Sequence, residues 1–334
     1  MNKPIITKKG SLLERAAEVY DFSARLNARA IPESDLQAPP VLKPVAPVPV
    51  VEAAKPVEMP RAVAAPAETP AASVARPTPV PPAALPVPGR QAKVDRNLLA
   101  ENQLLIPGAA IGVLAEEFRL AKRQLLLTAR QLNKHEPDKA RTILVCSAKP
   151  GDGKTYCAIN LAISMAAERD TRVLLVDADF AKPGIMERLG VADGPGLLDA
   201  LGDPAIDIEK CVVGTDIPNL SLLPAGAQTN ADVELVASGR TPELIARLLA
   251  ADPERMVIFD SPPALSASPA SVLALHVGQV MLVVRADKTT EGEIRDTVQR
   301  LEGCEHIQLL LNSVAFAPGG DRFGSYYGQE DEGQ

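Results

Sequence analysis

Apolar and polar residues follow two different patterns along the C-terminal two thirds of the chain. Short runs of consecutive apolar residues alternate with longer stretches in which apolar residues recur every three or four positions. The first pattern is typical of strands buried on both faces, and the second is typical of amphipathic helices. The predicted strands are 142–146, 172–176, 219–223, 255–259, 279–284 and 307–311, and the predicted helices are 114–133, 154–168, 231–237, 241–251 and 289–302. This alternation predicts an α/β fold, a doubly wound and mostly parallel sheet with helices on both faces.

The first hundred residues lack this alternation. Sixteen of the 31 prolines lie between Pro32 and Pro88, mixed with Ala and Val, which predicts an extended, disordered linker. The linker is interpreted as a flexible spacer or as a docking site for a proline-binding partner. Helical spacing over 11–27 predicts a short helix that either frays or folds on a partner. The expected organisation is a helical segment (1–30), a linker (31–100), a globular domain (101–314) and a flexible, Tyr-bearing tail (315–334).

Charge and cysteine usage narrow the functional classes. Residues 1–96 carry a net charge of +4 and the remainder carries −11. An acidic globular part argues against general binding of nucleic acid. The scattered cysteines and histidines suggest reduced thiols and no zinc site. No signal peptide or membrane span is recognised, so we expect a cytoplasmic protein that reaches the membrane through a partner.

One motif carries the strongest functional signal, the run Ser147-Ala-Lys-Pro-Gly-Asp-Gly-Lys-Thr155. It lies between a predicted strand and a predicted helix, as in a phosphate-binding loop. Its glycines let backbone N–H groups point at a phosphate, and the following helix N-terminus adds partial positive charge. Lys154 can reach the β and γ phosphates, and the Thr155 hydroxyl can ligate Mg²⁺. The strict pattern begins with Gly, where this chain has Ala148.

The motif predicts a P-loop NTPase that binds a nucleoside triphosphate. Lys149 has two interpretations: it is a solvated loop lysine, or it is a second cation near the triphosphate, supplied by a neighbouring subunit. The residues of this segment expected to contact the nucleotide are Lys149, Pro150, Gly151, Asp152, Gly153, Lys154, Thr155 and Tyr156.

Two predicted strands end in acidic residues. The strand 172–176 is followed by Asp177 and Asp179, and the strand 255–259 is followed by Asp260. Ligands of doubly wound sheets bind at this carboxyl edge, and Mg²⁺ prefers oxygen ligands. Each acid could instead cap a helix that follows the strand. Three acids together with Gly-Lys-Thr favour a magnesium site, with Asp260 as the direct or water-mediated partner of Thr155.

Three blocks of the chain resemble the bacterial tyrosine kinases, the cytoplasmic autokinases of exopolysaccharide export. The blocks are Ser147–Thr155, Val173–Asp179 and Val257–Pro263. The segment Glu116–Leu125 is similar to the oligomerisation helix of that family. The segment Ser11–Ala17 looks like the N-terminus of the subgroup encoded with PEP-CTERM/exosortase exopolysaccharide loci.

The resemblance implies roles for individual residues. The loop around Lys154 would be the Walker A site, Asp177 and Asp179 the Walker A′ site, and Asp260 the Walker B site. Lys154, Asp177 and Asp179 would be catalytic, with Asp177 helping to take the proton from a tyrosine hydroxyl. Asp179 and Asp260 would organise Mg²⁺ together with Thr155. The nucleotide would be ATP, used with Mg²⁺, and Asn312 would contact its adenine.

The resemblance also implies an assembly and a substrate. Tyr326 and Tyr327 in the tail would be phosphorylated in trans by a neighbouring copy. The chain would form a homo-oligomer and work with a separate membrane protein, a chain-length determinant or polysaccharide co-polymerase, which recruits it to the inner membrane. The oligomerisation motif of the family corresponds here to Glu116, Arg119 and Lys122.

Three features depart from the family pattern, and three functions are compared. Ala181 stands where the family usually has Arg, with Lys182 beside it as the substitute cation. Lys122 replaces the last Arg of the oligomerisation pattern, and the tail holds two tyrosines where the family often carries more. The leading hypothesis is an ATP-dependent tyrosine autokinase that regulates exopolysaccharide polymerisation and export. A non-kinase ATPase switch similar to the chromosome-partition and septum-site ATPases is the second, because Lys149 occupies their signature position. The third is an ATP-binding scaffold of the export complex without turnover, favoured by Ala181.

Overall fold

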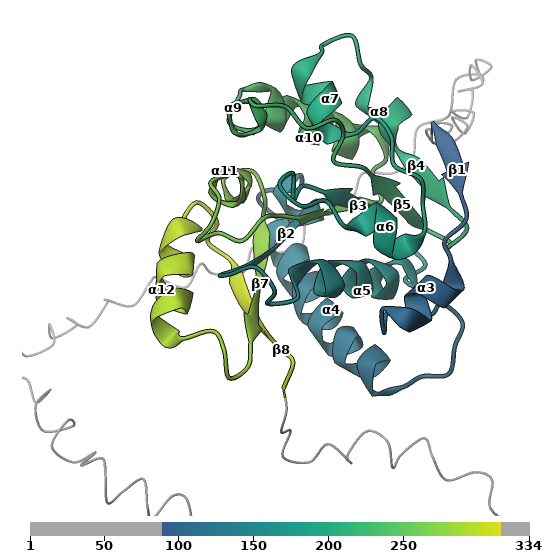
Figure 1. Cartoon of the computed structure of the whole chain (residues 1–334), viewed down its shortest axis with the longest axis vertical. Coiled ribbons are helices and arrows are strands. Elements are labelled where there is room, and N and C mark those ends of the chain that lie inside the picture. The colour runs from purple at the N-terminus through teal and green to yellow at the C-terminus, as the bar shows by residue number, and fades with distance from the viewer. Residues whose placement is uncertain (1–88, 315–334) are drawn as a thin grey trace, which may run out of the picture. The chain divides into compact units, whose positions relative to one another are not determined.

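The computed structural model describes residues 89–314, which form an eight-stranded sheet between two layers of helices (Figure 1). The strand order is β1-β4-β5-β3-β6-β2-β7-β8, and every neighbouring pair is parallel except β4 with β5. The predicted doubly wound, mostly parallel α/β fold is therefore confirmed. The strands are β1 (Arg90–Ala92), β2 (Thr142–Ser147), β3 (Arg172–Asp177), β4 (Val213–Thr215), β5 (Leu220–Leu223), β6 (Arg255–Asp260), β7 (Gln279–Arg285) and β8 (Ile307–Asn312).

Helices cover both faces of the sheet (Figure 1). One face packs against α3 (Arg96–Glu101), α4 (Val113–Leu132), α5 (Lys154–Ala166) and α6 (Ile185–Leu189). The other face packs against α7 (Leu197–Gly202), α8 (Ile208–Cys211), α9 (Asp232–Val236), α10 (Arg240–Ala251), α11 (Pro269–Ala274) and α12 (Glu291–Arg300). A 3-10 turn, η2 (Lys139–Arg141), leads into β2.

The two cores explain the apolar runs in the sequence. Leu144 and Leu174 pack into the core on the α7–α12 side, whereas Ile143 and Leu175 pack into the core on the α3–α6 side. Successive residues of a strand point to opposite faces, so a strand covered on both sides needs apolar residues at every position. The six predicted strands and five predicted helices of the domain each correspond to an observed element.

The ordered domain begins earlier than the sequence predicted. Residues 89–100, which were assigned to the linker, contain β1 and most of α3. Asp95 caps α3 by accepting a hydrogen bond from the Asn97 N–H at 2.8 Å, and Leu99 is buried in the core. Strand β1 pairs only with β4, far along the chain, so its three residues carry no local pattern of their own.

The short elements β4, α6, α7, α8 and α11 were also missed. The predicted N-terminal helix, most of the linker, and the tail with Tyr326 and Tyr327 lie outside the described residues. Within residues 89–314, no helix combines the length and the apolar character that crossing a bilayer requires.

Candidate nucleotide-binding site

The glycine-rich loop follows β2 and leads directly into α5. Gly151 and Gly153 have φ angles of +84° and +97°, a backbone region that glycine enters without steric cost. From Gly151 to Tyr156, no backbone N–H group donates to an acceptor within residues 89–314. Consecutive unpaired N–H groups at a helix N-terminus form an anion-binding concavity. The loop therefore fits a polyphosphate.

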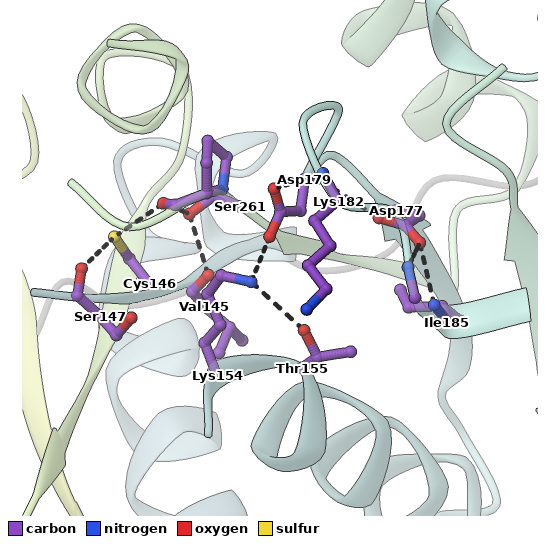
Figure 2. Close-up of polar contacts among 12 residues, drawn as sticks. Val145, Cys146, Ser147, Lys154, Thr155, Asp177, Asp179, Lys182, Ile185 and Ser261 are labelled. Carbon is purple, nitrogen blue, oxygen red and sulfur yellow. Dashed lines mark hydrogen bonds and ion pairs between the residues drawn. The ribbon is translucent and has the colours of Figure 1, made fainter. Parts of the chain in front are cut away.

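Lys154 lies at the centre of the site and forms an ion pair with Asp179 (Figure 2). Its ammonium also donates to the Thr155 hydroxyl at 3.3 Å. Burial lowers the pKa of Lys154, but the carboxylates of Asp260 and Asp179 outweigh this and leave the pKa above its usual value. Lys154 is therefore charged, and it would have to leave Asp179 to bind the oxygens of a phosphate.

Asp260 is the residue most clearly suited to a cation. It ends β6 beside Val145 of β2 and Asp177 of β3, and it is fully buried. Both carboxylate oxygens lack a hydrogen-bond partner in the described part of the chain. Burial raises the pKa of Asp260 to about 7, although Lys154 opposes the rise. A buried carboxylate without partners is unfavourable unless a cation joins it.

The acids do not form a complete metal cage. Residues 89–314 contain no group of three or more His, Cys, Asp or Glu side chains arranged to hold a metal ion. Mg²⁺ commonly binds to one or two protein groups and completes its shell with water and substrate phosphate. Thr155, Asp179 and Asp260 are the residues that would hold it here.

Comparison with known proteins places the chain in a family. The AAA domain family (AAA_31) matches residues 140–308, and the tyrosine-protein kinase YwqD of Bacillus subtilis is 30% identical over 57% of this chain and 79% of its own length. The chain belongs to the bacterial tyrosine-protein kinase family. The tyrosine kinase domain of BceF is similar in structure, with a TM-score of 0.50, 28% identity and coverage of 58% of this chain and 76% of that domain.

Longer members of the tyrosine-protein kinase family match only in part. Wzc of Salmonella typhimurium is 29% identical over 69% of this chain but only 31% of its own length. Across four such relatives, the match covers 22% to 31% of their length. The P-loop fold that this chain shares with the family implies nucleotide binding.

Asp177, the first Walker A′ acid of the tyrosine-protein kinase pattern, is engaged by its own loop. Its carboxylate accepts hydrogen bonds from the backbone N–H groups of Asp179, Gly184 and Ile185 at 3.3, 2.9 and 3.0 Å (Figure 2). Burial raises the pKa of Asp177. The alternative interpretation of a capping aspartate therefore describes these contacts, and its role as proton acceptor stays a prediction.

Lys182 follows Ala181, which stands where the family usually carries an arginine. Ala181 is exposed and offers no charge, whereas the Lys182 side chain points toward Thr155 (Figure 2). The Lys182 N–H donates to the Asp179 carbonyl at 3.0 Å, which fixes the start of this side chain beside the Walker A′ acid. A cation is thus available near the phosphate site despite Ala181.

Three predicted nucleotide contacts have other partners in the structure. The Lys149 ammonium pairs with Glu293 in the first turn of α12, within the same chain. The Tyr156 hydroxyl donates to the Gln103 carbonyl at 3.0 Å, and its N–H has no acceptor among the described residues. The Asn312 amide donates to the Asp152 carbonyl at 2.8 Å, and its adenine contact stays a prediction.

The predicted oligomerisation residues all lie on α4. Glu116 and Arg119 pair with each other at 2.5 Å. Lys122 donates to the Ser164 carbonyl at 3.0 Å and pairs with Glu168 at 2.6 Å, which ties α4 to the C-terminal part of α5. Lys122 is thus used within the chain, and the oligomerisation role of all three residues stays a prediction.

Sequence reasoning missed two residues that contact the loop, Arg285 and Glu293. The Arg285 guanidinium donates to the Gly151 carbonyl at 2.8 Å, and Glu293 holds Lys149. Glu293 also closes a capping box with Thr290, a Thr-x-x-Glu pattern that the sequence does show. No sequence motif identifies Arg285. Every residue has a backbone carbonyl, so the contact with the Gly151 carbonyl requires no particular residue type at that position.

Proposed function

We propose that the protein is an ATP-dependent protein-tyrosine autokinase that uses Mg²⁺ and acts on its own C-terminal tail in trans. The observation that carries the proposal is that the site holds polar groups of both kinds, donors and acceptors, that lack partners. The N–H groups of the loop from Gly151 to Tyr156 have no acceptor among the described residues, and the Asp260 carboxylate has no donor there. A nucleoside triphosphate with a bound divalent cation complements both groups, because its phosphates accept from the N–H groups and the cation binds the carboxylate.

The residues of the site would have separate roles in the reaction. The loop N–H groups and Lys154 would bind the phosphates, and Thr155, Asp179 and Asp260 would hold the metal. Bound Mg²⁺ would supply positive charge against the phosphate oxygens during transfer. The tyrosine oxygen attacks the γ phosphorus, the bond from that phosphorus to the β–γ bridging oxygen breaks, and ADP leaves. Asp177 accepts the hydroxyl proton, and its raised pKa makes it a stronger base than an ordinary carboxylate.

The cellular role rests on the family. We propose that the protein is cytoplasmic and regulates exopolysaccharide polymerisation and export. It would assemble as a homo-oligomer through α4 and be recruited to the inner membrane by a separate chain-length-determinant or co-polymerase protein. In this organisation the linker from residue 31 would connect the N-terminal segment (1–30) to the kinase domain, and the tail from residue 315 would deliver the phosphoacceptors to a neighbour.

Labelled ATP and phosphotyrosine mapping test the proposal. The wild-type protein with Mg²⁺ is expected to place label on Tyr326 and Tyr327, because a tail on a neighbouring copy presents them at high effective concentration. The Tyr326→Phe/Tyr327→Phe double variant should lose most of the label. A Tyr20→Phe variant is the matched control and should retain it.

Each remaining outcome of this assay supports a different function. Phosphate release without labelled protein would support the ATPase switch, and neither product would support the scaffold. The Lys154→Met protein is the blank for all three. Lys149 is half-exposed and pairs with Glu293 in its own chain, and this surface ion pair would break if Lys149 reached a nucleotide in a second copy.

A further inference from the structure

The carboxyl ends of β7 and β8 contact the carbonyl groups of the phosphate loop. Arg285 is the last residue of β7 and Asn312 is the last residue of β8, and the two are register partners in the sheet. The Arg285 guanidinium donates to the Gly151 carbonyl, and the Asn312 amide donates to the Asp152 carbonyl, both at 2.8 Å. Two neighbouring strand ends therefore hold two consecutive loop carbonyls.

The geometry points to Arg285 and Asn312 as positioning residues that aim the phosphate-binding amides. In a planar trans peptide, the C=O and the N–H of one unit point in opposite directions. The Gly151 carbonyl shares its peptide unit with the Asp152 N–H, and the Asp152 carbonyl shares its unit with the Gly153 N–H. Holding both carbonyls against the strand ends therefore turns both N–H groups to the opposite side, where neither has an acceptor in the described chain.

The loop needs this support because its own backbone is permissive. Gly151 and Gly153 adopt positive φ angles, and glycine populates many alternative conformations. The first half of the loop is held by its own residues: the Ser147 hydroxyl donates to the Lys149 carbonyl at 2.9 Å, and the Lys149 N–H donates to Asp152 at 3.0 Å. The carbonyls of Gly151 and Asp152 accept no hydrogen bond from within the loop among the described residues, and Arg285 and Asn312 supply the missing donors.

This positioning role can be distinguished by experiment from two alternatives, in which Arg285 or Asn312 contacts the nucleotide directly. If Arg285 bound the γ phosphate, its loss would weaken the binding of ATP much more than the binding of ADP. If Asn312 acted only on the adenine, its loss would leave inorganic triphosphate binding unchanged. Loss of a residue that orients the loop should weaken the binding of ATP, ADP and inorganic triphosphate alike, because all three bind to the same N–H groups.

The test measures binding to the full chain by calorimetry, with Mg²⁺ and with ADP, a non-hydrolysable ATP analogue and inorganic triphosphate as probes. Arg285→Met and Asn312→Ala are each expected to weaken all three probes by about tenfold, the size of one lost hydrogen bond to a charged or well-placed group. Arg285→Lys should recover part of the loss. Arg295→Met is the matched control, because Arg295 is 77% exposed on α12 and pairs only with Glu291 in the described chain.

The inference rests on nucleotide binding by the loop but not on kinase activity. Affinities of both variants within twofold of wild type would overturn it, as would a loss confined to the ATP analogue or to adenine nucleotides. Wild-type protein that binds none of the probes would overturn both this inference and the proposed function. Melting temperatures without nucleotide should match wild type. If Arg285→Met melts lower, the Arg285→Lys and Asn312→Ala proteins decide the question.

Discussion

Replacing Asp260 with Asn should stabilise the nucleotide-free protein at about pH 8 and remove the Mg²⁺ dependence of nucleotide binding. The pKa of Asp260 is about 7 in the folded protein, against 3.8 for an unperturbed carboxyl group. A folded pKa above the unfolded value means that ionisation opposes folding. The penalty is absent below about pH 4, grows between the two pKa values and is complete above about pH 7.

The size of the stabilisation has an upper bound of about 4 kcal/mol, from three pKa units at about 1.36 kcal/mol each. The Asn amide also lacks partners in this pocket, so we expect a gain of about 1–2 kcal/mol at pH 8. Thermal unfolding of both proteins at about pH 5 and pH 8 measures the gain, which should shrink toward the lower pH. Calorimetry with and without Mg²⁺ measures the metal dependence.

Asp252→Asn is the matched control for this experiment. Asp252 is 3% exposed, but its carboxylate is paired with Arg172 at 3.1 Å, away from the loop. Its replacement should lower the melting temperature and leave the Mg²⁺ dependence unchanged. An Asp260→Asn protein that melts below wild type at pH 8, or that still binds nucleotide more tightly with Mg²⁺, would contradict the metal assignment.

The sheet could be predicted because a strand buried on both faces needs apolar residues at consecutive positions. Runs such as Val173–Val176 contain only large apolar residues, as such a strand requires. Strand β1 has no such run, because its three residues are stabilised by pairing with Val213–Thr215 and are only partly covered. Its position after the proline-rich segment made the same residues look like linker.

The site could be predicted where chemistry selects the residue type. A phosphate calls for Gly and Lys and a metal calls for Asp, so Lys154 and Asp260 stood out by type and by position at strand ends. The direction of the Tyr156 ring depends on where Gln103 lies, which is a tertiary fact. The contact of Arg285 with a loop carbonyl depends on the register of β7 and β8, and no single-residue pattern encodes that register.

Gly153→Ala should reduce nucleotide affinity by roughly 30- to 150-fold. The φ angle of Gly153 is +97°, which places a side chain in a region that costs about 1–2 kcal/mol for an L-residue. A Cβ at this position would also lie 2.1 Å from the Asn312 amide nitrogen. Asn312 can move aside, but it then loses its bond to the Asp152 carbonyl, at about 1 kcal/mol. The loop of the variant should relax out of this conformation in the free protein and must regain it to bind phosphate. These effects, about 2–3 kcal/mol together, are then lost from the binding free energy, which gives the stated change in affinity.

Variants at two other glycines distinguish the effect of backbone strain on affinity from the effect of displacing Asn312. Gly151 has a φ of +84° but open space around its Cβ position, so Gly151→Ala adds strain without touching Asn312. Gly239 has a φ of −61° and equally open surroundings, so Gly239→Ala should bind nucleotide as wild type does. Calorimetry should rank the losses as Gly153, then Gly151, then Gly239. In the Gly153→Ala background, adding Asn312→Ala should cost less than it does in wild type, because the amide is already displaced. Equal losses in the two backgrounds would mean that Asn312 does not support the loop through this contact.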